Sequence, residues 1–477
     1  MLFKELMPDV TEALGNINIK GVTNDSRKVQ SGWAFVCVNG ALADGHNFVK
    51  SALENGAAVV VAERDVGAPC QVIVADTHKV YAEMCAAWFQ NPVKSLKIIG
   101  VTGTNGKTSV TYMIKSILEH NGEKVGLIGT IQNMIGDQII ESKNTTPGVY
   151  ELQELFAKMK SAGCKYVIME VSSHALDQRR VEGLEFSVGI FTNLTQDHLD
   201  YHITMENYML AKRKLFENSK ISIVNFDDEY SEKITSGLSS EKVTYSAKSD
   251  DATYTAKNIN YRTDGVDYEF VGFGTISRIK LSTGGRFSVY NSMCAVIAAI
   301  KLGFSAASAA AALSAINGVK GRAEVVPTGK DFTVIIDYAH TPDGLENILK
   351  TFKECKKNRL VVLFGCGGDR DKTKRPIMGK IATEYADFSI VTSDNPRTEN
   401  PSAIIEDILA GITDKKASYK VIENRKEAIE YAIKTAQKDD VIVLAGKGHE
   451  TYQILGRETI HFDEREVIAE VLSSLEK

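Results

Sequence analysis

The stretch LKIIGVTGTNGKTSVTYMIKSILEHN, from Leu96 to Asn121, decides the fold class. It begins with LKIIGV, a short apolar run that is typical of a buried strand. Apolar side chains then recur at positions 110, 113, 114, 117 and 118, which places them on one face of a helix. The loop TGTNGKTS lies between the strand and the helix. This order predicts a phosphate-binding loop, because loop N–H groups and the positive end of a helix dipole attract anions.

The residue types in this loop suit ATP and Mg²⁺. Gly103 and Gly106 allow tight turns, and Lys107 can reach the β and γ phosphates, while the hydroxyl after it can hold magnesium. The predicted nucleotide contacts are Gly103, Thr104, Asn105, Gly106, Lys107, Thr108 and Ser109. The general motif has a glycine where this chain has Val101, so the loop is a narrower variant. The alternative, a glycine-rich turn with an exposed lysine, leaves the flanking strand and helix without a purpose.

Strand-like and helix-like segments alternate along nearly the whole chain, which predicts an α/β protein with parallel sheets. A chain of 477 residues is too long for one core. A boundary is expected near Asn91-Pro92, because helices end before proline, and another near Gly321, after a run of alanine-rich helices. We predict a small N-terminal α/β domain (1–94), a central P-loop ATPase-like domain with a parallel sheet (95–321) and a C-terminal Rossmann-like domain (322–477).

Composition limits the partners and the compartment. The 56 Lys and Arg against 61 Asp and Glu give a net charge of −5, so we expect no broad binding of nucleic acid or anionic membrane. Seven scattered cysteines without a Cys-x-x-Cys pair suit a reducing compartment. The N-terminus lacks the apolar core of a signal peptide, and Lys301 and Gly303 interrupt the longest apolar stretch. We therefore expect a cytoplasmic protein without membrane insertion.

Three polar loops follow strand-like runs in the last third of the chain. They are GCGGDRDKTKRP after the run 359–365, SDNPRTENP after 388–393 and GKGHE after 441–446, and each loop begins with the last residue of its run. Ligands of open α/β sheets bind at the carboxyl ends of strands. The C-terminal domain is therefore expected to bind a ligand of its own.

Three further motifs close predicted strands: EVSSH at 170–174, NLTQDHLD at 193–200 and DYAHTP at 337–342. Together with TGTNGKTS, they resemble the motifs of the Mur ligases, a family related to the folylpolyglutamate synthetases. The resemblance covers essentially all 477 residues and is strongest to the ligases that add the third residue to UDP-N-acetylmuramoyl-L-Ala-D-Glu. It implies a monomeric, ATP-dependent ligase that joins a carboxylate to an amine through an acyl phosphate.

The resemblance also implies roles for individual residues. Lys107, Glu170, His198 and Lys212 would be catalytic, with Thr108, Glu170, His198 and a carbamylated Lys212 as magnesium ligands. Further nucleotide contacts would be Asn291, Arg322, Asp337 and His340. Without the resemblance, His198 reads as a structural histidine, Glu170 as a helix cap and Lys212 as a solvated helix lysine.

The resemblance assigns the UDP-sugar to the N-terminal domain, with Ser26 and His46 as contacts. The muramoyl-dipeptide contacts that it implies are Thr145, Thr146, Ser172, Gln178 and Arg180. Hydroxyls and an arginine suit diphosphate and carboxylate oxygens.

The incoming amine is expected at Asp394-Asn395-Pro396-Arg397, a sequence that in this family marks enzymes taking meso-diaminopimelate rather than L-lysine. The arginine can pair bidentately with the carboxylate that lysine lacks. Arg370, Gly446 and Glu450 complete the set that the resemblance implies. In isolation, the same four residues read as a proline-containing turn.

Several alternatives remain open at this point. L-lysine or another diamino acid could be the amine, and folylpolyglutamate synthetase shares the chemistry but lacks a UDP-binding first domain. A P-loop NTPase switch would turn over ATP without an amine. A catalytically silent protein of the same fold would have no use for intact Lys107, Thr108, Glu170 and His198.

Overall fold

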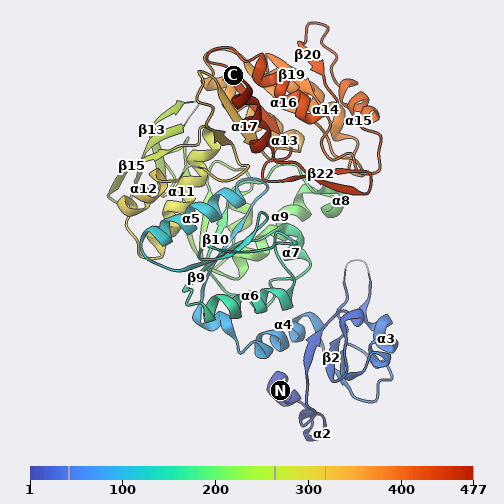
Figure 1. Ribbon diagram of the computed structural model, residues 1–477. Helices are drawn as coiled ribbons and strands as arrows, with labels where there is room; N and C mark the ends of the chain where they lie inside the picture. The colour runs from blue at the N-terminus through green and yellow to red at the C-terminus, as the bar shows by residue number, and fades with distance from the viewer. Residues whose placement is uncertain (41–42, 263–264, 317, 476–477) are drawn as a thin grey trace. The chain divides into compact units, whose positions relative to one another are not determined.

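The computed structural model describes residues 1–40, 43–262, 265–316 and 318–475. The chain divides into two compact units, Met1–Thr244 and Tyr245–Lys477 (Figure 1). The first unit is built mainly from parallel strands, whereas the second combines a parallel core sheet with antiparallel strands, and helices pack against the sheets in both.

The first unit begins with a four-stranded parallel sheet in the order β1-β2-β3-β4. Asp76 caps the long helix α4 by accepting a hydrogen bond from Lys79 N. Helix α4 ends at Trp88, close to the helix end expected before Pro92, and Asn91 has a left-handed backbone (φ +50°). The elements are α1 (Phe3–Leu6), α2 (Glu12–Gly15), β1 (Gly21–Thr23), η1 (Ser26–Lys28), β2 (Trp33–Val36), η2 (Gly45–Phe48), α3 (Val49–Glu54), β3 (Ala57–Ala62), β4 (Gln71–Ile73), α4 (Thr77–Trp88) and η3 (Pro92–Ser95).

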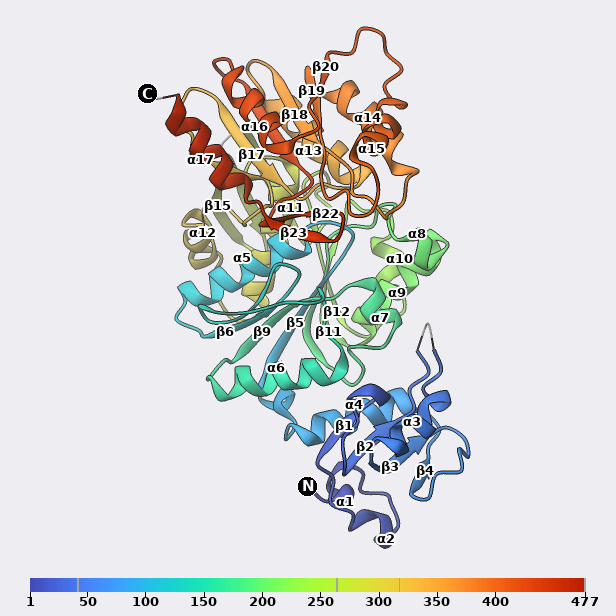
Figure 2. The same ribbon diagram turned by 45° about the vertical axis from the view of Figure 1, so that its right-hand side comes forward.

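The same unit continues with a larger sheet, in which β5 lies between β9 and β10, parallel to both. This register places Val101 opposite Glu170 and Thr102 opposite Phe191, so the loops after β5, β9 and β10 share one edge. Figure 2 shows α7 and α9 side by side near this edge. The elements are β5 (Lys97–Thr102), α5 (Lys107–His120), β6 (Val125–Ile128), β7 (Asn133–Ile135), β8 (Gln138–Ile140), α6 (Val149–Ser161), β9 (Tyr166–Glu170), α7 (Ser173–Asp177), β10 (Phe186–Phe191), α8 (Leu199–His202), α9 (Met205–Glu217), β11 (Ser219–Asn225), α10 (Ser231–Thr235) and β12 (Glu241–Ser246).

The second unit opens with three antiparallel strands, which the sequence had not predicted. Two helices follow them, and the first, α11, buries nearly every residue from Ser288 to Ala299. The elements are β13 (Tyr254–Arg262), β14 (Gly265–Gly272), β15 (Thr275–Leu281), α11 (Arg286–Lys301) and α12 (Ala306–Ser314).

The C-terminal sheet has the order β16-β17-β21-β18-β19-β20, parallel except for the edge strand β16. Helices α13, α14 and α15 cover one face with one apolar cluster, and α16 and α17 cover the other with a second cluster. This makes three layers, as a Rossmann-like domain requires. The elements are β16 (Glu324–Val326), β17 (Thr333–Asp337), α13 (Pro342–Cys355), β18 (Leu360–Phe364), α14 (Lys374–Tyr385), β19 (Phe388–Val391), α15 (Pro401–Leu409), β20 (Tyr419–Val421), α16 (Arg425–Lys434), β21 (Val441–Ala445), β22 (Tyr452–Leu455), β23 (Glu458–His461) and α17 (Glu464–Ser474).

The predicted α/β class is confirmed, as are the strand, loop and helix at β5 and α5 and the four strands of the C-terminal domain. The domain boundaries at residues 94 and 321 stay predictions. In the part of the chain that the structure describes, no helix combines the length and the apolar character needed to cross a membrane.

Candidate active site

The loop between β5 and α5 has the geometry of a phosphate cradle. Gly103 has φ +149°, and a Cβ there would lie 1.9 Å from Thr192 Oγ1, so only glycine fits. Lys107 Nζ donates to Gly103 O and Thr104 O, both at 2.9 Å, and thus lies folded over the loop. The amine is therefore held where a phosphate on the loop would meet it.

Thr108 and Glu170 meet beside this loop. Thr108 Oγ1 donates to Glu170 Oε2 at 3.0 Å, and both residues are buried. Thr130 adds hydrogen bonds to the same carboxylate from its N–H and its hydroxyl, both 2.9 Å. A buried hydroxyl beside a buried carboxylate offers the oxygen ligands that Mg²⁺ prefers, and Mg²⁺ takes its remaining ligands from water and phosphate. The pair therefore fits a magnesium ion at this position.

The predicted magnesium ligand His198 begins α8 with a left-handed backbone (φ +53°). Its Nε2 lies 3.4 Å from Asp197 Oδ2, and its ring lies 4.8 Å from the ring of His174. Burial, against the opposing effect of Asp197, lowers the pKa of His198. Within the described residues, no three His, Cys, Asp or Glu side chains are grouped as a metal site, so His198 and Glu170 do not form one with a third such residue.

Lys212 is almost completely buried on α9, so the interpretation as a solvated helix lysine is wrong. Its Nζ lies 4.4 Å from the ring centroid of Tyr208. Burial first, and then the charge of Lys107, hold the pKa of Lys212 well below its usual range. A neutral amine is the nucleophilic form of lysine, and this is the form that a carbamylation requires.

The residues predicted to hold the muramoyl-dipeptide lie together at the end of β9. Thr146 Oγ1 donates to Glu170 O (2.9 Å) and accepts from Ser172 N (3.0 Å). Arg180 donates to Thr146 O (3.0 Å) and, through Nε and Nη2, to Gln178 Oε1 (3.0 and 2.7 Å). One further member of the set is Thr145, whose hydroxyl lies 3.0 Å from that of Thr130.

The two residues predicted to contact the UDP-sugar are buried in the N-terminal sheet region. Ser26 opens η1, where Asp25 caps the turn. His46 is engaged at both ring nitrogens: Nδ1 lies 2.6 Å from Asp44 Oδ1, and Nε2 accepts from Glu63 N at 2.9 Å. This histidine therefore has a structural role in the free chain.

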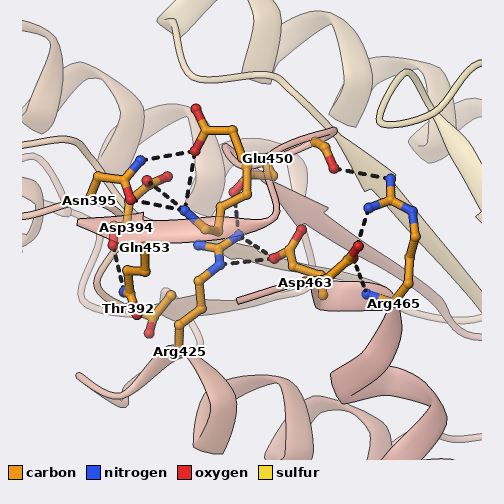
Figure 3. Close-up of polar contacts among 12 residues, drawn as sticks. Thr392, Asp394, Asn395, Arg425, Glu450, Gln453, Asp463 and Arg465 are labelled. Atoms are coloured by element: carbon orange, nitrogen blue, oxygen red, sulfur yellow. Dashed lines mark hydrogen bonds and ion pairs between the residues drawn. The ribbon is translucent and has the colours of Figure 1, made fainter. Parts of the chain in front are cut away.

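In the second unit, the loops after β19 and β21 meet (Figure 3). Asn395 Nδ2 donates to Glu450 Oε2 at 2.9 Å, and Lys447 Nζ donates to Asn395 Oδ1 at 3.1 Å. Arg397 has a left-handed backbone (φ +51°), and its guanidinium donates to Gly368 O at 2.8 Å. Loops after three strands are thus connected, as strand-end positions predicted.

The other predicted residues of this unit lie partly in α11 and partly in and around the C-terminal sheet. Asn291 is buried in α11. Arg322 lies 4.8 Å from the ring centroid of Tyr338. Asp337 accepts from Ala323 N (2.6 Å) and Ala339 N (2.8 Å), and burial raises its pKa. The remaining members are Pro396 at the turn after Asn395, Gly446 after β21, exposed Arg370, and exposed His340, whose Nδ1 lies 2.8 Å from Tyr338 O.

Sequence reasoning missed two buried cations that organise these loops. Lys447 is fully buried among polar groups. Arg375, also fully buried, binds Glu399 with both terminal nitrogens (3.0 and 2.9 Å), and Glu399 in turn accepts from Asp369 N. The sequence shows both only as charged residues in or near loops. It could not reveal their burial, because burial depends on the tertiary structure.

Comparison with known proteins identifies the class. Residues 18–91 match the sequence model of the Mur ligase family, catalytic domain; residues 101–299 match the Mur ligase middle domain; and residues 321–448 match the Mur ligase, glutamate ligase domain. The chain belongs to the Mur ligase family and is a ligase of the ATP-dependent, peptide-bond-forming kind. The predicted resemblance is thereby confirmed.

Particular members are similar over the full length. The UDP-N-acetylmuramoyl-L-alanyl-D-glutamate–2,6-diaminopimelate ligase of Caldanaerobacter subterraneus is 49% identical over 97% of this chain and 96% of its own. A ligase of the same name from Clostridium acetobutylicum is 49% identical over all of both chains. A solved structure of a ligase with this name has a TM-score of 0.77 at 32% identity and covers 100% of this chain and 99% of its own.

Proposed function

We propose that the chain joins meso-diaminopimelate to UDP-N-acetylmuramoyl-L-Ala-D-Glu with consumption of ATP, a step of peptidoglycan synthesis. The observation that carries the proposal is the meeting of Arg397, Asn395 and Glu450 at the ends of two strands. The full-length relatives at 49% identity, which are named for this reaction, support it.

The reaction needs an activated carboxylate, because a free carboxylate is a poor acceptor for an amine. The glutamyl carboxylate of the UDP-linked substrate attacks the γ phosphorus of ATP and displaces ADP, which gives an acyl phosphate. The amine of the second substrate attacks the acyl carbon, loses a proton, and phosphate leaves. Catalysis of this kind depends on positioning and on compensation of phosphate charge.

The chain's own residues provide both. Lys107 over the phosphate loop faces the β and γ phosphates, while Thr108 and Glu170 would hold Mg²⁺, which adds positive charge beside them. A carbamate on the neutral amine of Lys212 would add a further anionic oxygen ligand, because carbamylation exchanges a positive charge for a negative one.

The UDP-linked substrate is proposed to bind at two places. Ser26 and His46 would contact the UDP part, and the group around Thr146, Ser172 and Arg180 would receive the peptide part. The arginine there already donates to a main-chain oxygen, so a carboxylate would add a charge-assisted bond to a positioned cation.

Selectivity for the amine would come from Arg397. Its guanidinium can form a bidentate pair with the carboxylate that diaminopimelate carries at the end where lysine has none. Lysine would leave that guanidinium without its anionic partner, and a site built on such a pair discriminates strongly. L-lysine is the second candidate amine.

Phosphate release tests the proposal. The purified protein receives ATP, Mg²⁺ and UDP-N-acetylmuramoyl-L-Ala-D-Glu, with either meso-diaminopimelate or L-lysine. Release that depends on diaminopimelate and is weak with lysine supports the proposal. Release with lysine alone retains the ligase and refutes the role of Arg397, and release that ignores both amines refutes the ligase reaction.

A further inference from the structure

Lys447 is a fully buried lysine among the groups proposed to receive the amine. Its Nζ donates to Asn395 Oδ1 (3.1 Å) and to Glu450 Oε2 (3.3 Å) and lies 3.7 Å from Asp394 Oδ1. Figure 3 shows Asp394, Asn395 and Glu450 facing one another from the two loops. One buried ammonium therefore bridges Asp394, Asn395 and Glu450.

Without the Lys447 ammonium, Asp394 and Glu450 would lie close together with no cation to compensate their negative charges. Asp394 and Glu450 are both largely buried carboxylates of one small region. Burial raises the pKa of Glu450, Asp394 raises it further, and Lys447 opposes both. Two carboxylates sharing a site without a cation do not both stay ionised.

The surrounding elements supply few other charges toward Glu450. Tyr338 after β17 and Tyr452 on β22 face it, and burial first, then the charge of Glu450, raises the pKa of each tyrosine. The Arg322 guanidinium lies 4.8 Å from the ring centroid of Tyr338. The charge of Arg397 opposes the rise in the pKa of Tyr452. The direct hydrogen bonds to Glu450 come from Lys447 and Asn395.

Lys447 also fixes the orientation of the Asn395 amide. The Oδ1 atom accepts from Lys447 Nζ and from Ile454 N (3.0 Å), which leaves Nδ2 to donate to Glu450. An amide without such partners can present either end. The lysine thus sets both the charge and the direction of the acceptor group.

We infer that Lys447 is a positioning residue for the incoming diamino acid: its ammonium compensates the charges of Asp394 and Glu450 and orients the Asn395 amide, so that the two carboxylates can accept the substrate's distal ammonium. The inference rests on the proposed function. With Lys447 and Arg397 as cations and Asp394 and Glu450 as anions, the group is neutral overall. It matches a substrate head that carries one ammonium and one carboxylate.

Substitution of Lys447 tests the inference. Lys447→Met removes the charge and the donor, Lys447→Gln keeps a donor but removes the charge, and Lys447→Arg keeps the charge. The control is Lys434→Met, which alters an exposed lysine at the end of α16 that pairs with Glu430. KM for each of the three substrates and kcat are measured for all variants between pH 7 and pH 9.

We expect KM for the diamino acid to rise at least tenfold at pH 7 in the Met and Gln variants, while KM for ATP and for the UDP-linked substrate changes less than twofold. The rise should shrink toward pH 9, where a carboxyl that became protonated ionises again. The Arg variant should recover part of the loss, and the control should match the unaltered protein.

Two results would overturn the inference: an unchanged KM for the diamino acid in Lys447→Gln, or equal changes in all three KM values that do not depend on pH. If Lys447→Met does not fold, Lys447→Gln alone decides. The assay uses whichever diamino acid the unaltered protein turns over. A preference for lysine thus counts against the proposed function and leaves the role of Lys447 testable.

Discussion

The ion pair between Arg425 and Glu464 predicts a large and specific loss of stability on substitution. Both side chains are fully buried, with Nε and Nη2 of the arginine 2.9 and 2.7 Å from Glu464 Oε1. Arg425 Nη2 also donates to Ala445 O at 2.9 Å, at the end of β21. Arg425→Leu would leave the Glu464 carboxylate without its cation, buried where water cannot solvate its charge.

Breaking a buried pair from one side costs about 3–5 kcal/mol, a large part of the about 5–15 kcal/mol that holds a domain folded. Replacing both partners removes both charges and is near neutral or stabilising by up to about 4 kcal/mol. The carbonyl of Ala445, left without its donor, costs about 1–3 kcal/mol. Arg425→Leu with Glu464→Leu should therefore lie within about 3 kcal/mol of the unaltered protein.

Hydrogen exchange of the β21 amides is the suitable measurement, because it reports the free energy of opening of this sheet. Tryptophan fluorescence provides an internal control, since Trp33 and Trp88 both lie in the N-terminal region, far along the chain from the substitutions. A loss below about 1 kcal/mol in Arg425→Leu, or single losses that simply add in the double variant, would refute the argument.

Three further predictions concern the active-site region. The Arg375 hydrogen bonds lower the pKa of Glu399 from the ordinary 4.5 to about 2, so the stabilisation from this carboxylate is present above about pH 4.5 and is lost as pH falls through about 2. The Tm of Glu399→Gln should therefore fall less than that of the unaltered protein over this pH window, and an identical pH profile of Tm would contradict this. Carbamylation of Lys212 predicts lower activity in CO₂-free buffer that added bicarbonate restores, whereas Lys212→Arg should be inactive with or without bicarbonate. Gly446 has φ +116°, and a Cβ there would lie 2.5 Å from Asp394 Oδ2. Gly446→Ala should therefore raise KM for the diamino acid by about tenfold, equivalent to about 1.4 kcal/mol, and leave KM for ATP unchanged. Equal rises in both KM values would refute the local effect.

Local sequence was sufficient for the phosphate loop. The glycines, the lysine and the amphipathic pattern of 110–118 each depend on neighbours in the chain, so the strand, loop and helix at 97–120 could be predicted from one stretch. The C-terminal strands were equally accessible, because buried parallel strands are continuous apolar runs. Their order in the sheet, with β21 between β17 and β18, could not be derived from those runs.

The hairpin of β22 and β23 was missed, although a signal for it existed. The signal is Gly456, whose φ is +62° and which, with Arg457, separates Tyr452–Leu455 from Glu458–His461 by the two residues of a tight hairpin turn. The sequence analysis predicted the GKGHE motif next to it as a ligand-binding loop after a strand and predicted no strands beyond it. In the structure, the hairpin backbone binds the loop after β19: Arg397 N donates to Ile454 O, and Gly456 N donates to Arg397 O (3.2 and 2.8 Å).

Burial was the property least accessible to sequence. Lys212 lies in a Lys-Arg-Lys run, which indicates a solvated face, and Lys447 follows a glycine in a polar loop. Both are buried because elements distant in the chain cover them, and the same burial gives each its proposed use. Lys212 has its pKa lowered where Lys107 is the principal neighbouring charge, whereas Lys447 lies against two carboxylates.

The contrast between these two lysines follows from their partners rather than from their burial. Desolvation disfavours an ammonium in both places. Near Lys107, the Tyr208 ring and the charge of Asp197 offset that cost only in part, so the pKa of Lys212 stays well below its usual range and the neutral amine, which is open to chemical modification, is favoured. Lys447 Nζ, in contrast, lies 3.7 Å from Asp394 Oδ1 and 3.3 Å from Glu450 Oε2, so it can serve as the countercharge of two carboxylates that would otherwise repel each other. The ligase can thus use lysine for two tasks. A carbamate on Lys212 would add negative charge near one substrate, and Lys447 would compensate the negative charge of the carboxylates beside the other.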